Sequence, residues 1–206
     1  MLTVVAGIAD AVGYITMGGV FAANMTGNTV LAGIDLAKGD HLGAWYHLTP
    51  LVAFFPGAML ARVLHLLLKA PTAGLLIEAA IIAAVGFVDI GPEPAVMVVA
   101  FAMGIQASVI TSFAGNSVST VVVTSTLART ADTVVDRLWP SATVKPPSTV
   151  NTLLLTLTWT GYLAGALVGG LLVPRMAQPL LVPAALLLAV VLLGPLFAPS
   201  AERRPT

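Results

Sequence analysis

The chain has 206 residues, of which 58% are hydrophobic and 9% charged, with a mean hydropathy of +0.98. This composition excludes a soluble globular protein and is typical of an integral membrane protein. Nine Lys and Arg balance nine Asp and Glu, so the sequence offers no basic surface for nucleic acid. Because cysteine is absent and the three histidines are scattered, we expect no metal and no other cofactor.

Apolar stretches long enough to span a bilayer, about 20 residues each, recur six times along the chain. The first begins at Leu2, has no basic residue before it and contains Asp10, which favours a retained span over a cleaved signal peptide. We therefore predict an all-α polytopic protein whose single transmembrane domain covers 1–206. The predicted spans are 2–22, 46–68, 73–90, 94–116, 149–173 and 177–198.

Two shorter segments, 27–37 and 124–139, follow the first and fourth spans and are too short or too polar to cross. We expect them to be re-entrant or interfacial helices. With six crossings both termini lie on one side, which collects seven Lys and Arg against two on the other. The excess of positive charge in cytoplasmic loops then predicts that both termini are cytoplasmic.

The two halves of the chain resemble each other, which indicates an internal repeat. The stretch 75–85 aligns with 180–190, and Gly57-Ala58 aligns with Gly165-Ala166. Phe21-Ala22-Ala23-Asn24 likewise resembles Phe113-Ala114-Gly115-Asn116. Three crossings in each half, 1–90 and 94–198, would invert the second repeat relative to the first.

A polar, glycine-containing break, 23–29, interrupts apolar sequence after the first span. Unsatisfied polar groups are costly in lipid, so such a break survives where protein or a water-filled cavity lines it. We expect it to bind a solute together with its counterpart at 116–126, with Asn28 capping the following helix; the alternative is a purely structural helix break. The candidate binding residues are Asn24, Thr26, Gly27, Asn28, Gln106, Asn116, Thr124 and Thr126.

Acidic side chains within the spans are candidates for proton coupling, because a charge at the bilayer centre costs about 2.5–3.5 kcal/mol on insertion scales. Asp10 lies four residues before Tyr14, so the tyrosine hydroxyl is expected to bond the carboxylate from the same helical face. Glu78, near the cytoplasmic end of the third span, is the other candidate. For both acids the alternative is a structural or solvated carboxyl group.

Small residues recur every four positions at Gly161, Gly165 and Gly169, which is typical of a face where helices approach closely. We expect this face to pack within the protomer, and a homodimer is the alternative.

The residues Gly7-Ile8-Ala9-Asp10, the run 19–29 with its Ala-Asn-Met-Thr-Gly-Asn core, and Met103-Gly104-Ile105-Gln106 resemble the YoaK-like family of bacterial membrane proteins. That resemblance covers nearly the whole chain and implies six helices in a bacterial inner membrane, with no assigned function. Ser125 stands where the family's second signature usually has Gly.

No hydrolase constellation is present, since a serine nucleophile needs a base and none of the three histidines lies in a polar helical segment. We expect that the protein is not an enzyme. We expect a transporter for a small anionic or polar solute, with the lipid bilayer and that solute as its partners. The alternative is a membrane scaffold or regulatory protein that transports nothing.

Overall fold

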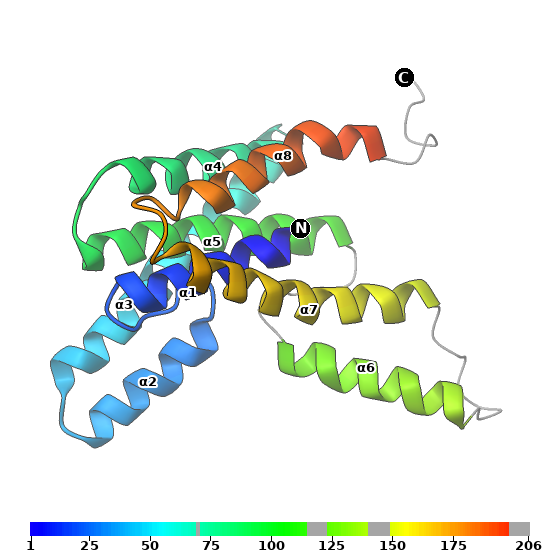
Figure 1. The fold of residues 1–206 in the computed structure, drawn as a ribbon, viewed down its shortest axis with the longest axis horizontal. Helices are drawn as coiled ribbons and strands as arrows, with labels where there is room; N and C mark the ends of the chain where they lie inside the picture. Colours follow the sequence, from blue (N-terminus) through cyan, green and yellow to red (C-terminus); the bar gives the residue numbers. More distant parts are fainter. Residues whose placement is uncertain (69–70, 115–122, 140–148, 198–206) are drawn as a thin grey trace.

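The computed structural model describes residues 1–68, 71–114, 123–139 and 149–197, and within them it contains eight α-helices and no strand. Six helices form the main bundle, and the other two lie on one side of it (Figure 1). The helices are α1 (Leu2–Thr16), α2 (Met25–Ala37), α3 (His41–Leu68), α4 (Pro71–Phe87), α5 (Pro92–Ala114), α6 (Val123–Leu138), α7 (Thr149–Leu172) and α8 (Leu181–Phe197).

Three helices are long and apolar enough to cross a membrane by length and composition, namely α3, α5 over 92–109 and α7 over 153–172. The predicted spans at 46–68, 94–116 and 149–173 are therefore supported as span candidates. The helices at the other three positions, α1, α4 and α8, are apolar but have only 15, 17 and 17 residues.

Two predicted helix boundaries are wrong, and the local backbone explains both. The first helix, expected to run to residue 22, ends at Thr16 because Gly18 and Gly19 follow with φ of 74° and 78°, conformations that a helix cannot contain. The helix expected from residue 46 begins at His41, where the Asp40 carboxylate accepts a hydrogen bond from Gly43 N at 2.9 Å and so caps α3.

The two short segments are helical, as predicted, and they occur at matching places in the chain. Eight residues separate α1 from α2, and eight separate α5 from α6. Figure 1 shows both short helices below the bundle, α2 toward one end and α6 toward the other, each beginning near the middle of the molecule.

The α1–α7 contact is one of two close helix crossings, and glycines on both helices allow it. A Cβ added at Gly7 would collide with the carbonyl oxygen of Tyr162, and one added at Gly165 would collide with that of Val4. Gly161 and Gly169 also lie against α1. The prediction that this small-residue face packs within the protomer is confirmed.

The α3–α5 contact is the second close crossing and is built in the same way. A Cβ added at Gly57 would meet the carbonyl oxygen of Phe101, and one added at Gly104 would meet that of Phe54. Backbones in contact at this distance leave room for no side chain. Both crossings therefore depend on glycine at two matched places.

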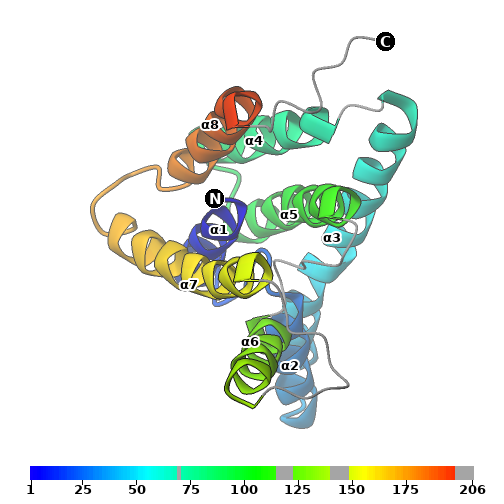
Figure 2. The same ribbon diagram turned by 90° about the vertical axis from the view of Figure 1, so that its right-hand side faces the viewer.

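The remaining helices surround these two crossings. Helix α4 packs against α5 and α8, while α2 packs along α3 and α6 along α7. Figure 2 shows four pairs facing each other from left to right: α8 and α4 at the top, α1 and α5 below them, then α7 and α3, and finally α6 and α2.

Candidate functional site

The polar break after α1 is held by Asp10, whose side chain is 2% exposed. One carboxylate oxygen accepts hydrogen bonds from the backbone N–H groups of Ala23, at 2.6 Å, and Asn24, at 3.1 Å. The other accepts a short hydrogen bond from the Tyr162 hydroxyl on α7. One carboxylate therefore joins α1, the connection to α2 and a helix from the other half of the chain.

Asn24 and Gly27 shape the start of α2. The Asn24 side-chain oxygen accepts a hydrogen bond from Gly27 N at 3.0 Å, which makes Asn24 the N-cap of the helix. A Cβ at Gly27 would lie 2.9 Å from the Phe21 ring, so glycine leaves space for that ring. The expectation that Asn28 caps this helix is wrong, because the helix begins one turn earlier than expected.

Asn28 is fully buried and is bonded at both ends of its amide to the backbone of Phe21. Its oxygen accepts from Phe21 N at 2.9 Å, and its nitrogen donates to Phe21 O at 2.7 Å. The Asn28 side chain thus satisfies both backbone hydrogen-bonding groups of Phe21, as a neighbouring strand would in a sheet. The side-chain oxygen of Asn24 and both ends of the Asn28 amide are thus hydrogen-bonded to the protein's own backbone.

Tyr14 does not lie where the helical spacing suggested. Its ring stacks on Phe21 at a centroid distance of 4.9 Å and is about half exposed, whereas the hydroxyl that reaches Asp10 belongs to Tyr162. The prediction of Tyr14 as the partner of Asp10 is wrong, because α7 crosses α1 on the face that carries the carboxylate. The signal for Tyr162 was its position inside the Gly161–Gly169 packing face.

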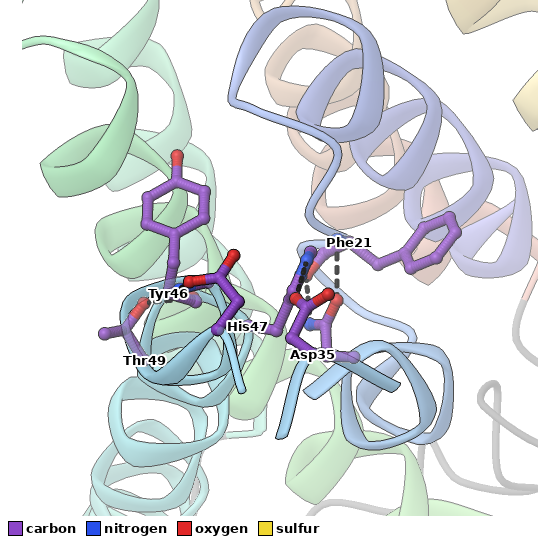
Figure 3. Close-up of polar contacts among 8 residues, drawn as sticks. Phe21, Asp35, Tyr46, His47 and Thr49 are labelled. Carbon is purple, nitrogen blue, oxygen red and sulfur yellow. Dashed lines mark hydrogen bonds and ion pairs between the residues drawn. The ribbon is translucent and has the colours of Figure 1, made fainter. Parts of the chain in front are cut away.

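The loop is also bonded to α3, and α2 is joined to α3 by a His–Asp pair that the sequence did not single out (Figure 3). The Tyr46 hydroxyl donates to Met17 O at 3.0 Å, and its ring lies against Gly18. His47 Nε2 lies 3.3 Å from the carboxylate of Asp35 at the end of α2. Asp35 and His47 lie on different helices, and the turn between α2 and α3 brings them together. Their spacing in the sequence therefore could not predict this pair.

Two other predicted site residues are buried elsewhere in the bundle. Gln106 on α5 donates to Leu2 O at 3.2 Å, and its side-chain oxygen has no hydrogen-bond partner among the described residues. Glu78 on α4 is fully buried, and neither carboxyl oxygen has a partner in the described part of the chain. The alternative considered for Glu78, a carboxyl group solvated near a membrane surface, is therefore wrong.

The other predicted site residues differ in how far the structure describes them. Thr26 is exposed, and its hydroxyl has no hydrogen bond within the described ranges. Asn116 lies outside the described residues, and of the side chains of Thr124 and Thr126 nothing is described. The structure therefore brings Asn24, Gly27 and Asn28 together with Asp10, while Gln106 and Glu78 lie apart from them.

A cavity of about 450 Å³ lies away from the polar break. Its lining comes from the end of α1, the α4–α5 connection with the helix ends beside it, and the segment before α8, namely Val12, Thr16, Met17, residues 85–92, Ala95 and residues 177–180. None of the predicted site residues lines it. In the described part of the chain, no three His, Asp or Glu side chains gather in a way that would hold a metal ion.

Comparison with known proteins gives this helical chain its family. A family model described as "Protein of unknown function (DUF1275)" matches residues 1–193. The chain belongs to the DUF1275 family. The chain is also 31% identical over 150 residues to the UPF0700 transmembrane protein YoaK of Bacillus subtilis (strain 168), across 68% of this chain and 67% of that protein.

Membership confirms the YoaK-like resemblance and identifies this DUF1275 chain as a membrane protein of an uncharacterised family. No solved structure matches it. The function of the site is therefore inferred from the residues of this chain alone.

Proposed function

We propose that this protein is a transporter for a small polar solute, with six crossings arranged as two inverted repeats, 1–90 and 94–198. Its location in a bacterial inner membrane and its cytoplasmic termini are part of the proposal. The observation that carries it is the match between the two glycine crossings. Inverted repeats of this kind form secondary transporters whose sites lie between the halves.

The two crossings match residue by residue. The same number of residues separates Gly7 from Gly104 and Val4 from Phe101. The carbonyl groups of Val4 and Phe101 are the ones that lie against a glycine of the partner helix in the two crossings. Likewise, the spacing from Gly57 to Gly165 relates Phe54 to Tyr162. The distance along the chain from Gly7 to Gly104 is five residues longer than the distance from Phe21 to Phe113, the pair aligned from the sequence.

Helices α4 and α8 add independent support through their burial. Leu75, Ala79 and Ile82 are buried on α4, and their aligned counterparts on α8 and directly before it are buried as well, namely Leu180, Ala184 and Leu187. Both helices therefore turn the same aligned face inward. Chance similarity between apolar sequences would not reproduce the buried face.

The directions of the helices favour inversion over a parallel repeat. In Figure 1, α1 runs from right to left and α5 from left to right, and the same reversal relates α3 to α7 and α4 to α8. Facing pairs in Figure 2 are the equivalent helices of the two halves. An axis in the membrane plane would produce both relations.

Transport is favoured over a scaffold because ionisable and amide side chains are buried among apolar helices, where they are costly and usually functional. Asp10 is the group to which we assign proton coupling, with Tyr162 as its hydroxyl partner, and Glu78 is the second buried acid. The exposed hydroxyl of Thr26 is the candidate contact for solute at the break. The proposal does not extend to an anionic solute, since no Lys or Arg belongs to the lining of the cavity.

Single cysteines test the topology, because the chain contains none. A membrane-impermeant maleimide added to intact cells should label Glu93→Cys, in the first turn of α5, and should leave Arg129→Cys, on α6, unlabelled until the cells are opened. The opposite pattern, or labelling of both from outside, would reject the proposed orientation.

A ligand screen tests transport itself. Purified protein is screened for solute-dependent thermal stabilisation with amino acids, sugars, carboxylates and amines, and each stabilising compound is then offered as radiolabel to proteoliposomes. We expect saturable uptake that Asp10→Asn abolishes, with Thr29→Ala as an exposed control from the same region. No stabilisation and no uptake with any compound would favour the scaffold or regulatory function.

A further inference from the structure

The two buried acids of the bundle have opposite surroundings. Asp10 accepts three hydrogen bonds, from two backbone N–H groups and the Tyr162 hydroxyl, and these suit an ionised carboxylate. Glu78 on α4 is fully buried, and neither of its carboxyl oxygens has a partner among the described residues. An ionised carboxylate in such a place would have nothing to balance its charge. Glu78 therefore needs one positive charge that the described side chains do not supply.

Gln106 on α5 also has a buried acceptor without a partner. Its nitrogen donates to Leu2 O at 3.2 Å, whereas its oxygen has no hydrogen bond in the described part of the chain. The oxygens of an ionised glutamate and of a glutamine amide can only accept hydrogen bonds. They cannot satisfy one another unless a proton or a cation is added between them.

The α4–α5 register brings these two side chains to one level of the bundle. A Cβ added at Gly74 would lie 2.7 Å from a Val109 methyl and 3.3 Å from Ile105, which fixes how the helices face each other. The two helices run antiparallel (Figure 1), so Glu78, one turn after Gly74, lies level with the α5 turn just before Gln106. Side chains on a helix lean toward its N-terminus, so in this antiparallel pair Glu78 and Gln106 lean toward each other.

The face of α4 that carries Glu78 leads to the cavity. It continues through Ile82, one turn on, to Gly86, which belongs to the cavity lining. By the same register Val99 on α5 lies level with Ile82, and both side chains are fully buried. Glu78 thus lies roughly 12 Å along α4 from the cavity, behind one packed layer.

We propose that Glu78 and Gln106 form a buried proton-binding site, in which the protonated carboxyl group donates to the Gln106 oxygen and the proton exchanges with solvent in the cavity past Ile82. A proton fits a site that the cavity does not reach and that has no exposed surface. Three acceptor oxygens are too few for Mg²⁺ or Ca²⁺, which take about six or more oxygen ligands. As a step of coupled transport the site rests on the proposed function, whereas its protonation does not.

The ionisable groups around Glu78 leave its charge unpaired. Helix α8 has no ionisable residue, and Glu93, the one on α5, is exposed in the first turn. Helix α3 meets α4 near their connection, and neither Arg62 nor His65 on α3 forms an ion pair with Glu78 within the described ranges. The charge of this site therefore depends on the proton that Glu78 itself binds.

Infrared spectroscopy of the purified protein tests the site without any solute, because a protonated carboxyl group has a C=O band separate from that of a carboxylate. At neutral pH the wild-type spectrum minus that of Glu78→Gln should contain this band. The same difference for Glu93→Gln, an exposed glutamate, should not contain it. Absence of the band from the Glu78 difference would overturn the proton site.

Gln106→Leu tests the acceptor. It should move the Glu78 band to higher frequency, because the carboxyl group loses the oxygen to which it donates. A change that merely loosened the packing would not shift this band in a fixed direction. An unshifted band would exclude Gln106 from the site.

Sodium is the other source of one positive charge, and thermal unfolding distinguishes it from a proton. Replacing choline chloride by sodium chloride at constant ionic strength should change the unfolding midpoints of wild type and Glu78→Gln equally. A midpoint that sodium raises in wild type and not in Glu78→Gln, together with no protonated-carboxyl band, would overturn the proton in favour of a sodium site.

A thiol block tests the route from the cavity. Thr16→Cys places a single thiol in the cavity lining of this cysteine-free chain, and a bulky maleimide bound there should slow the shift of the Glu78 band in D₂O several-fold. The control is the same maleimide on Leu42→Cys, an exposed position outside the cavity. Equal exchange in both labelled proteins would overturn entry through the cavity. Failure to transport any solute would leave all these signals unchanged, so the two failures are distinguishable.

Discussion

The two helix crossings share their glycines but not their polarity. Where the α1–α7 crossing has Asp10 bonded to Tyr162, the matched positions of the α3–α5 crossing have Ala107 and Phe54. Both pairs of helices nevertheless approach to backbone contact. The buried carboxylate is therefore not what makes the helices cross, and its two bonds to backbone N–H groups show that it holds the connection to α2.

The comparison predicts the largest effect for the glycines that the crossings share. Gly165→Ala and Gly57→Ala each place a methyl group against a carbonyl oxygen of the partner helix and should destabilise the protein to a similar degree, by about 1–3 kcal/mol or more. Thermal unfolding followed by tryptophan fluorescence in detergent measures this.

The matched control is Gly170→Ala on the same helix, because nothing lies within 4 Å of a Cβ at that position. It should keep wild-type stability. A strong effect at Gly165 with none at Gly57 would show that the crossings are not equivalent.

A somewhat smaller, one-sided effect is expected from Asp10. Asp10→Ala leaves two backbone N–H groups and one hydroxyl without an acceptor, at about 1–3 kcal/mol for a buried unsatisfied group. Asp10→Asn retains one acceptor oxygen and should lose less.

Tyr162→Phe places at the α1–α7 crossing the residue type that Phe54 has at the α3–α5 crossing. It removes a single hydrogen bond and should lower the free energy of unfolding by about 1 kcal/mol. Urea or thermal unfolding of the three variants should rank them in this order. If Tyr162→Phe costs as much as Asp10→Ala, the carboxylate acts mainly on the crossing and not on the loop.

Asn28 tests whether the loop itself depends on side-chain bonds to its backbone. Asn28→Ala removes both bonds to Phe21 from a fully buried site and should cost about 1–3 kcal/mol. The exposed neighbour Thr29 bonds only to Met25 O within its helix, so Thr29→Ala should change stability little. Limited proteolysis near residue 20 offers a second readout, and equal protection in both variants would contradict this role.

The smallest effect should come from the pair that joins α2 to α3. Asp35→Asn removes the charge opposite His47, and a partly exposed pair of this kind contributes about 0–1 kcal/mol. Unfolding midpoints at low and high salt should differ little between this variant and wild type. A large loss would mean that the turn is held by the charge and not by the capping of α3 by Asp40.

Sequence reasoning found the helices because apolar length and polar interruptions are local properties. The eight helices, the packing face at Gly161, Gly165 and Gly169, and the break after the first helix all follow from patterns along the chain. It failed where distant segments meet. Tyr162 and not Tyr14 reaches Asp10, and His47 meets Asp35, because crossing geometry decides which faces approach.

The cavity was missed for a related reason. Its lining comes from three connections and helix ends that carry no motif, so no residue pattern could indicate it. By contrast, the polar side chains of Asn24 and Asn28 are hydrogen-bonded to backbone groups close to them in the sequence. Their hydrogen bonds are local in sequence, but the loop conformation that they stabilise becomes apparent only in three dimensions.

The short length of α4 and α8 has a consequence for the surrounding lipid. At 1.5 Å per residue, α4 and α8 each extend roughly 26 Å, against about 30 Å of hydrocarbon in a typical bilayer. Helices α4 and α8 pack together at one edge of the bundle in Figure 2, so in the proposed topology the bilayer must thin along that edge. Lipids with shorter acyl chains should therefore stabilise the reconstituted protein, and longer chains should favour association of molecules through this edge.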